Sequence, residues 1–149
     1  MSELIGVVGE SGTGKSTACR TLNPKDTAVV NCVGKPLPFK GWKKNYTKFE
    51  GKTGNYFASD KTVDILKFMK AVSDNRSEIK NLIIDDWQYT MSNEFMRRSS
   101  EKGFEKFTEI GKNAWSTLNA GKALREDLKV FVLTHSDTVP GEFGAKPTI

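Results

Sequence analysis

The chain has 149 residues, of which 37% are hydrophobic, and it carries a formal net charge of +5. This length predicts a single domain, 1–149, with a buried core, and the composition excludes a disordered chain. The longest apolar runs are about five residues, whereas a membrane span needs ~20, and the start MSELIGVV lacks a secretory signal, so we expect a cytoplasmic protein without membrane contact.

Four short apolar runs predict strands that are buried on both faces of a parallel sheet. These runs are Leu4–Val8, Ala28–Cys32, Leu82–Asp85 and Val130–Thr134. Helical spacing of apolar residues predicts helices between them, at Ser16–Leu22, Thr62–Ser73 and about Ser92–Leu124. Alternating strands and helices are typical of the α/β class, in which helices flank a mostly parallel sheet.

The longest helical stretch carries an apolar stripe, which predicts that one face packs against the core. The stripe consists of Phe104, Phe107, Ile110, Ala114, Trp115 and Leu118. We expect glycines to divide this stretch into pieces, at Gly103, Gly111 and Gly121.

Two segments predict irregular structure. The first, Lys35–Asp60, is rich in lysine, glycine and aromatic residues, and the second is the Pro- and Gly-rich tail 136–149. Because the chain stops in such a tail soon after the run that ends at Thr134, we expect a domain that is cut short at its C-terminus.

The segment GESGTGKS follows the first apolar run and fits the P-loop pattern G-x-x-x-x-G-K-[ST]. Its glycines let backbone N–H groups turn toward phosphate oxygens, and the start of the next helix adds partial positive charge. We expect the Lys15 ammonium to reach the β- and γ-phosphates and the Ser16 hydroxyl to bind Mg²⁺. The alternative is a glycine-rich turn without a ligand. The predicted nucleotide-binding residues are Gly9, Glu10, Ser11, Gly12, Thr13, Gly14, Lys15, Ser16 and Thr17.

A P-loop needs a second anchor for its metal ion, and the segment NLIIDDW has the expected form of an apolar strand that ends in aspartate. Asp85 is the candidate for binding Mg²⁺ through water, and Asp86 for orienting or deprotonating the attacking water. The alternative for Asp86 is that it caps the following helix. Glu10, inside the P-loop, is a weaker candidate for the catalytic role.

The fourth apolar run ends in LTHSD, which places polar residues at the tip of the strand expected beside the P-loop strand. Thr134 and His135 are therefore candidate sensors of the γ-phosphate. His135 would act as a hydrogen-bond donor to phosphate rather than as a metal ligand. The alternative for His135 is a loop residue that is hydrogen-bonded within the protein.

Three classes of P-loop protein compete. A GTPase would carry D-x-x-G and N-K-x-D, which DDWQ and THSD do not fit. A small-molecule or nucleotide kinase usually needs an arginine-rich lid, and arginine is scarce here, but this class stays open. The third class is the AAA/RecA-like ATPase, in which an extra strand lies between the P-loop strand and the aspartate strand.

The P-loop, the segment NLIIDDWQYTMSNEFMRRSSEKGFEKFTEIGKNAW and the segment VFVLTHSD together resemble phage-encoded AAA/RecA-like ATPases. The resemblance covers roughly residues 4–149, and DDWQYTMSNEFM is its most specific part. Some relatives are grouped with phage single-strand annealing and recombination ATPases. The resemblance implies ATP as the nucleotide, a RecA-like sheet, homo-oligomers and work on DNA during phage replication or recombination, in the host cytoplasm.

The chain departs from the RecA-like arrangement in one respect. There, a further strand after the sensor strand flanks the P-loop strand, and this chain ends before one could form. The P-loop strand is therefore expected at an exposed edge of the sheet. A fragment, a shortened version of the domain and a protomer that completes its sheet with a neighbour all fit this expectation.

The segment KPLPFKGWKKNYTKFEGKTGNYF interleaves lysines with aromatic residues, which predicts a surface for single-stranded DNA. In one alternative the rings pack under a long loop while the lysines stay solvated, and in another Trp42 stacks on adenine. The candidate DNA contacts are Lys40, Trp42, Lys43, Lys44 and Lys48.

The segment MRRSS supplies Arg97 and Arg98, which are candidate arginine fingers acting in trans at a subunit interface. The alternative is a solvated helix face. Together these features predict a Mg²⁺-dependent ATPase that acts on DNA. The alternatives are a P-loop kinase and a nucleotide-gated DNA-binding module with little turnover.

Overall fold

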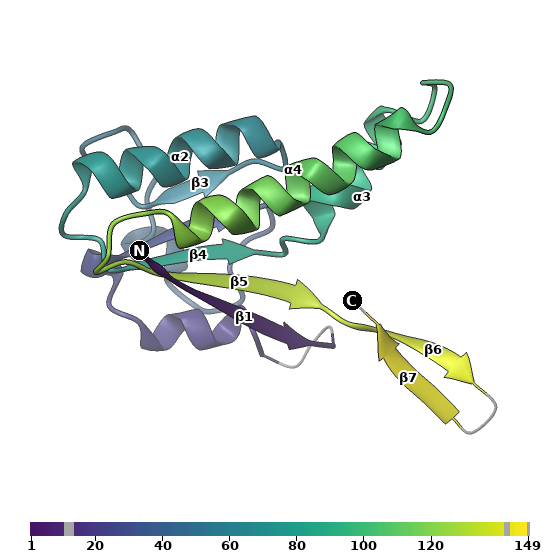
Figure 1. Cartoon of the computed structure of the whole chain (residues 1–149). Coiled ribbons are helices and arrows are strands. Elements are labelled where there is room, and N and C mark those ends of the chain that lie inside the picture. Colours follow the sequence, from purple (N-terminus) through teal and green to yellow (C-terminus); the bar gives the residue numbers. More distant parts are fainter. Residues whose placement is uncertain (11–13, 142–143, 149) are drawn as a thin grey trace.

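The computed structural model describes residues 1–10, 14–141 and 144–148, and its main body is a five-stranded sheet in the order β1-β5-β4-β2-β3 (Figure 1). All pairings in this sheet are parallel, which confirms the predicted α/β class. The strands are β1 (Glu3–Gly9), β2 (Thr27–Asn31), β3 (Tyr56–Ala58), β4 (Asn81–Asp85) and β5 (Lys129–His135). The helices are η1 (Thr17–Thr21), η2 (Pro24–Asp26), α1 (Trp42–Asn45), α2 (Thr62–Asn75), α3 (Tyr89–Arg97) and α4 (Glu105–Lys122).

The strand order confirms that an extra strand separates the P-loop strand from the aspartate strand. This strand is β5, which lies between β1 and β4. In the parallel register Gly9 lies opposite His135, and Asn31 lies opposite Asp85. Because parallel strands all point the same way, these residues gather at one edge of the sheet.

Helices α2 and α4 cover one face of the sheet (Figure 1). Ile65 and Met69 of α2 are fully buried there, together with Val30, Leu82 and Val130 of the strands. The structure describes no helix that is long and apolar enough to cross a membrane.

The opposite face of the sheet is covered by shorter pieces of chain. Cys19 of η1 and two residues around α1, Leu37 and Tyr46, pack with Ile83 and Leu133 of the central strands. All five side chains are buried. This small second core joins the segment after the P-loop to the sheet.

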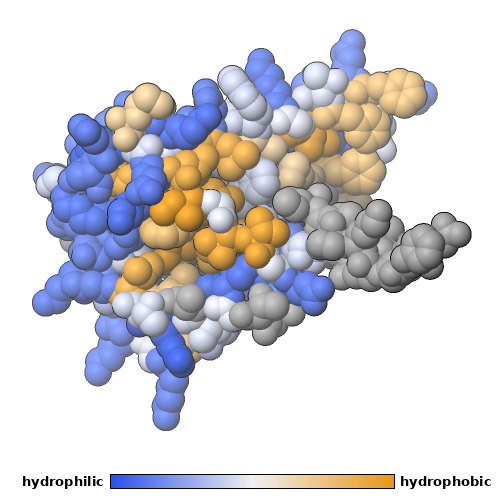
Figure 2. All heavy atoms as spheres, turned by 60° about the horizontal axis from the view of Figure 1, so that its bottom comes forward, coloured by the Kyte–Doolittle hydropathy of each residue, from blue (hydrophilic) through white to orange (hydrophobic). Residues whose placement is uncertain are grey.

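Strand β1 lies at the edge of the described sheet, as predicted, because it pairs with β5 alone. Val8 of this strand is 48% exposed. Figure 2 turns the lower side of Figure 1 toward the reader and shows hydrophobic side chains at the surface in the middle of the view. An edge of this kind leaves backbone groups available for pairing.

The prediction of a helix after the P-loop, at Ser16–Leu22, is wrong in type and length. The structure has only the five-residue 3₁₀ helix η1. Asn23, which precedes Pro24, is extended with a ψ of 117°. Proline disfavours the helical region for the residue before it, so the chain cannot continue as a helix through this point.

The prediction that 35–60 is irregular is also wrong in part, because this segment contains α1 and β3. The buried side chain of Asn55 fixes the loop before β3, accepting from the Thr47 N–H and donating to the carbonyls of Pro24 and Asn45. Within β3, the ring of Phe57 stacks on Phe68 at 5.1 Å. These long-range contacts have no local signal in the sequence.

Of the three glycines expected to break the long helical stretch, only Gly103 does so. It has a φ of +87° between α3 and α4, whereas Gly111 and Gly121 lie inside α4. A Cβ atom at Gly121 would lie 3.0 Å from Cδ1 of Leu4. Gly121 therefore lets α4 approach β1 closely and does not end the helix.

The apolar stripe of this stretch is only partly in the core. Ile110 and Ala114 are buried, but Phe104, Phe107 and Trp115 are 85%, 46% and 61% exposed. The start of α4 extends with α3 past the sheet (Figure 1), so no strand is available to cover Phe104 and Phe107 there, whereas Trp115 lies in the middle of α4. The prediction that all of these side chains face the core is therefore wrong.

The tail 136–149, predicted to be irregular, instead forms an antiparallel ribbon of β6 (Asp137–Gly141) and β7 (Gly144–Thr148). Pro140 and Pro147 both lie in this ribbon. In a two-stranded ribbon each strand has an unpaired side, so prolines, which weaken central strands, are tolerated.

Replacing Ile65 by alanine tests the main core. Ile65 is fully buried, so Ile65→Ala should lower the free energy of unfolding by about 2–5 kcal/mol. Val63 belongs to the same helix but is 62% exposed, so Val63→Ala should change it by less than about 0.5 kcal/mol. Urea unfolding of both variants measures the difference, and equal effects would contradict the assigned burial.

Candidate functional site

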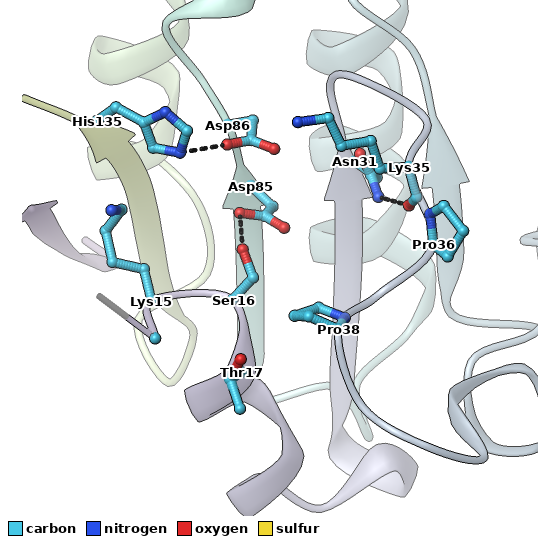
Figure 3. A pocket seen from close by; sticks show the side chains of 11 residues that line it. Lys15, Ser16, Thr17, Asn31, Lys35, Pro36, Pro38, Asp85, Asp86 and His135 are labelled. Carbon is cyan, nitrogen blue, oxygen red and sulfur yellow. Dashed lines mark hydrogen bonds and ion pairs between the residues drawn. The ribbon is translucent and has the colours of Figure 1, made fainter. Parts of the chain in front are cut away.

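A polar cavity of about 240 Å³ lies at the carboxyl edge of the sheet (Figure 3). Its walls come from the P-loop, the tips of β2, β4 and β5, and the segment after β2. The residues that line it are Gly14, Lys15, Ser16, Thr17, Asn31, Lys35, Pro36, Pro38, Asp85, Asp86 and His135.

The structure brings much of the predicted P-loop to this cavity. Gly14 has a φ of +89°, which only glycine adopts readily, and it begins the part of the loop that lines the wall. The Lys15 ammonium donates to the carbonyls of Gly9 and Glu10, at 2.6 and 2.7 Å. Three predicted nucleotide-binding residues, Ser11, Gly12 and Thr13, lie outside the described residues.

Ser16 and Asp85 join the P-loop to the tip of β4. The Ser16 hydroxyl donates to Oδ1 of Asp85 at 2.8 Å (Figure 3). Asp85 is only 4% exposed, and burial raises the pKa of its carboxyl above the usual value, although the hydrogen bond from Ser16 opposes this shift. A hydroxyl beside a carboxylate suits Mg²⁺, which proteins usually bind through few side chains plus phosphates and waters. The described residues contain no cluster of three or more carboxylate, histidine or cysteine ligands.

Asp86 takes an unusual backbone conformation at the end of β4. Its φ of 57° is the only left-handed one among the described non-glycine residues. Its Oδ1 lies 3.0 Å from Nε2 of His135, and both side chains line the cavity. Asp86 does not cap α3, because the N-cap of this helix is Gln88.

Gln88 is a site residue that the sequence reasoning missed. Its Oε1 accepts hydrogen bonds from the Thr134 hydroxyl at 3.0 Å and from the His135 backbone N–H at 3.2 Å. Gln88 thus ties the start of α3 to the tip of β5. Thr134, predicted as a sensor, is buried with its hydroxyl on Gln88 and does not line the cavity, whereas His135 does.

The cavity also has a wall that was not predicted, formed by Asn31 and the segment with Lys35, Pro36 and Pro38. The signal that the sequence carries for it is Asn31, a polar residue near the end of the apolar run Ala28–Cys32, much as Asp85 ends the run Leu82–Asp85. Glu10, the weaker catalytic candidate, is exposed and is not among the residues that line the cavity.

The candidate DNA contacts lie on the segment that contains α1. Lys40, Lys43, Lys44 and Lys48 are exposed, but the Trp42 ring is half-buried and lies 5.2 Å from Tyr56. Neighbouring rings turn inward as well: Tyr46 is buried, and Phe49 and Phe57 pack on Phe68. These rings pack on one another within the protein while the lysines stay exposed, which fits the alternative of packed rings with solvated lysines. Contact between this segment and DNA stays a prediction.

The two candidate arginine fingers both make ion pairs within the chain. Arg97 lies 3.0 Å from Asp60, and Arg98 pairs with Glu101 and Glu109, each at 2.7 Å. Neither arginine lines the cavity of its own chain.

Comparison with known proteins gives one family. The sequence profile of the family described as AAA domain matches residues 2–119, which include the P-loop, both aspartates of the cavity and most of α4. No curated protein matches the chain significantly.

Because the pKa of Asp85 is raised, we expect the effect of Asp85→Asn on stability to depend on pH. The folded protein holds the Asp85 proton more tightly than the unfolded chain does, so wild-type stability falls as the pH rises from the ordinary carboxyl pKa to the raised one. Asp85→Asn should therefore be more stable than wild type at pH 7.5, and the difference should shrink toward pH 4.

Asp127 supplies the matched control for this experiment. Hydrogen bonds from Lys80 and Arg125 lower the pKa of its carboxyl, so this ionised group contributes stability that is lost as the pH falls. Asp127→Asn should be less stable than wild type at pH 7.5. Urea unfolding at both pH values measures these differences, and an Asp85→Asn protein that loses stability at pH 7.5 would contradict the account of Asp85.

Proposed function

Because the chain belongs to the AAA domain family of P-loop ATPases, we propose that it binds ATP with Mg²⁺ and hydrolyses it. We further propose that hydrolysis drives work on DNA during phage replication or recombination. The observation that carries the proposal is the Ser16–Asp85 hydrogen bond, which puts a P-loop hydroxyl and a buried carboxylate side by side on the cavity wall.

In this proposal the P-loop holds the phosphates and Mg²⁺. Lys15 exchanges the carbonyls of Gly9 and Glu10 for oxygens of the β- and γ-phosphates, which are stronger acceptors because they are charged. Ser16 binds the metal directly, and Asp85 binds it through water. When bound, Mg²⁺ neutralises charge that develops on the phosphates. The buried Asp85 carboxylate would gain a positive partner at this position.

Asp86 is the proposed base for the attacking water. Its left-handed backbone turns the carboxylate into the cavity, and His135 holds one carboxylate oxygen in place, which leaves the other for the water. His135 can also donate to the γ-phosphate. Gln88 fixes the backbone of His135 and links it to Thr134, so the proposed sensing of hydrolysis passes from His135 to α3 through Gln88.

The proposed action on DNA rests on the exposed lysines around α1. Lys40, Lys43, Lys44 and Lys48 have exposed side chains and can neutralise backbone phosphates, so binding should weaken as salt rises. The proposed homo-oligomer would place Arg97 or Arg98 at a neighbour's site, which requires that arginine to leave its partner in the chain. Arg97 is the better candidate, because its side chain is 40% exposed and its pair with Asp60 is easier to break, whereas Arg98 is only 19% exposed and pairs with two glutamates.

Phosphate release from MgATP, with and without single-stranded DNA, tests the proposed activity. We expect several-fold stimulation by DNA, and a loss of turnover of roughly 10²- to 10³-fold in Lys15→Ala, because a charged contact to the phosphates is removed. ADP formation that depends on an added acceptor would favour a kinase instead. Tight ATP binding without phosphate release would favour a nucleotide-gated DNA-binding module.

Replacing Asp86 by asparagine tests the proposed base. Asp86→Asn should lower kcat by about 10²- to 10⁴-fold with little change in ATP affinity, because general-base catalysis contributes that much to a rate. Asp74 is half-exposed in a surface pair with Lys70, so Asp74→Asn serves as the control with normal turnover. Steady-state kinetics separates the two effects, and an Asp86→Asn protein with wild-type kcat would rule out this base.

A further inference from the structure

The segment after β2 places a second lysine at the cavity. Lys35, Pro36 and Pro38 form the wall that faces the P-loop, so Lys35 lies on the side opposite Lys15 (Figure 3). The Lys35 side chain points toward Asp86 in this view (Figure 3). It makes no ion pair with a described residue.

The backbone at Lys35 is held by a buried side chain. Asn31, which is 2% exposed, donates from Nδ2 to the Lys35 carbonyl at 2.5 Å. Its Oδ1 accepts from the backbone N–H groups of Val33 and Gly34, at 3.2 and 2.8 Å. Gly34 has a φ of +76°, which suits glycine. These bonds fix Lys35 relative to the tip of β2, next to Asp85 in the sheet.

The Lys35 ammonium has a defined position over an aromatic ring. Its Nζ lies 5.8 Å from the centre of the Tyr89 ring, and that ring packs edge-on against His135 at 6.2 Å. A cation is attracted to the face of an aromatic ring, which favours one direction of a flexible side chain. Tyr89 therefore holds the charge near His135, which lines the cavity.

The positive charge of Lys35 balances negative charge on the cavity wall. Two lysines, Lys15 and Lys35, face two aspartates, Asp85 and Asp86. Without Lys35 the aspartates would outnumber the lysines, and a phosphate placed beside Asp86 would be repelled. Lys35 lies on the side of Asp86, which is where the terminal phosphate must be if Asp86 is to direct a water at it.

We propose that Lys35 binds the γ-phosphate and makes the site select nucleoside triphosphates over diphosphates. The inference rests on the proposed function, because it assumes that ATP binds to the P-loop. Lys15 and Lys35 then hold the terminal phosphate from two sides. Lys35 also supplies, within the chain, positive charge that stabilises the transferred phosphoryl group. A diphosphate, held by the P-loop alone, does not reach it.

Calorimetric titration with Mg²⁺ and either ADP or a non-hydrolysable ATP analogue tests the inference. Lys35→Met keeps the length of the side chain without its charge, and Lys35→Arg keeps the charge. Lys35→Met should weaken binding of the triphosphate roughly 10- to 100-fold and that of ADP less than about 2-fold, because one charged hydrogen bond to the γ-phosphate is lost. Lys35→Arg should keep most of the affinity.

A control variant at a second lysine and the thermal stability of each variant show whether a change in binding comes from lost surface charge or from partial unfolding. Lys112 is an exposed lysine on α4, and Lys112→Met should bind both nucleotides like wild type. A Lys35→Met protein that melts like wild type but weakens both nucleotides equally, or neither, would overturn the inference. Weakened DNA binding with unchanged triphosphate binding would make Lys35 a nucleic-acid contact instead. Wild-type protein that binds neither nucleotide would overturn the proposed function itself.

Discussion

The parallel register of the central strands is the constraint on which the candidate site depends. It aligns the ends of β1, β5, β4 and β2, so that Gly9, His135, Asp85 and Asn31 reach the same edge of the sheet. Each of these strands is an apolar run that ends in a polar residue or a glycine. A slip of one residue in any pairing would move a buried side chain to the other face of the sheet. The hydrophobic core therefore fixes the positions of the chemical groups.

Interactions between charged and polar groups stabilise the two aspartates at the carboxyl ends of the strands even without a ligand. Asp85 and Asp86 are adjacent and both are buried, which is costly for charged groups. Ser16 donates to Asp85, His135 lies against Asp86, and two lysines line the same cavity. The partners come from three different parts of the chain: the P-loop, the end of β5 and the segment after β2. Such a balance of opposite charges suits a ligand that brings both a cation and an anion, as a metal-bound nucleotide does.

Much of the fold and part of the site could be predicted from the sequence because their signals are local. The apolar runs identify four of the strands, and the spacing GESGTGKS identifies Lys15 and Ser16. The position of Asp85 follows from the strand that it ends. These features depend on neighbouring residues, and neighbours along the chain are visible in a sequence.

The rest could not be predicted because it depends on contacts between distant residues. β3 is held by Asn55 and by Phe68, and Lys35 reaches the cavity only because Asn31 holds its backbone. In the sequence Gly121 indicates a break in the helix, because its close approach to Leu4 is not visible there. The aromatic residues of the lysine-rich segment were expected at the surface but pack inward. The aromatic residues of the α4 stretch were expected in the core but are exposed. Hydrophobic character alone does not say which neighbour a ring finds.

We propose that one site, between the P-loop and the tip of β4, holds a metal-bound triphosphate. A crystal structure with Mg²⁺ and a non-hydrolysable ATP analogue tests it most directly. We expect the metal on the Ser16 hydroxyl with Asp85 behind a water, and the γ-phosphate between Lys15 and Lys35 within one water molecule of Asp86. A nucleotide bound away from the P-loop, or a metal ion without Ser16 among its ligands, would contradict it.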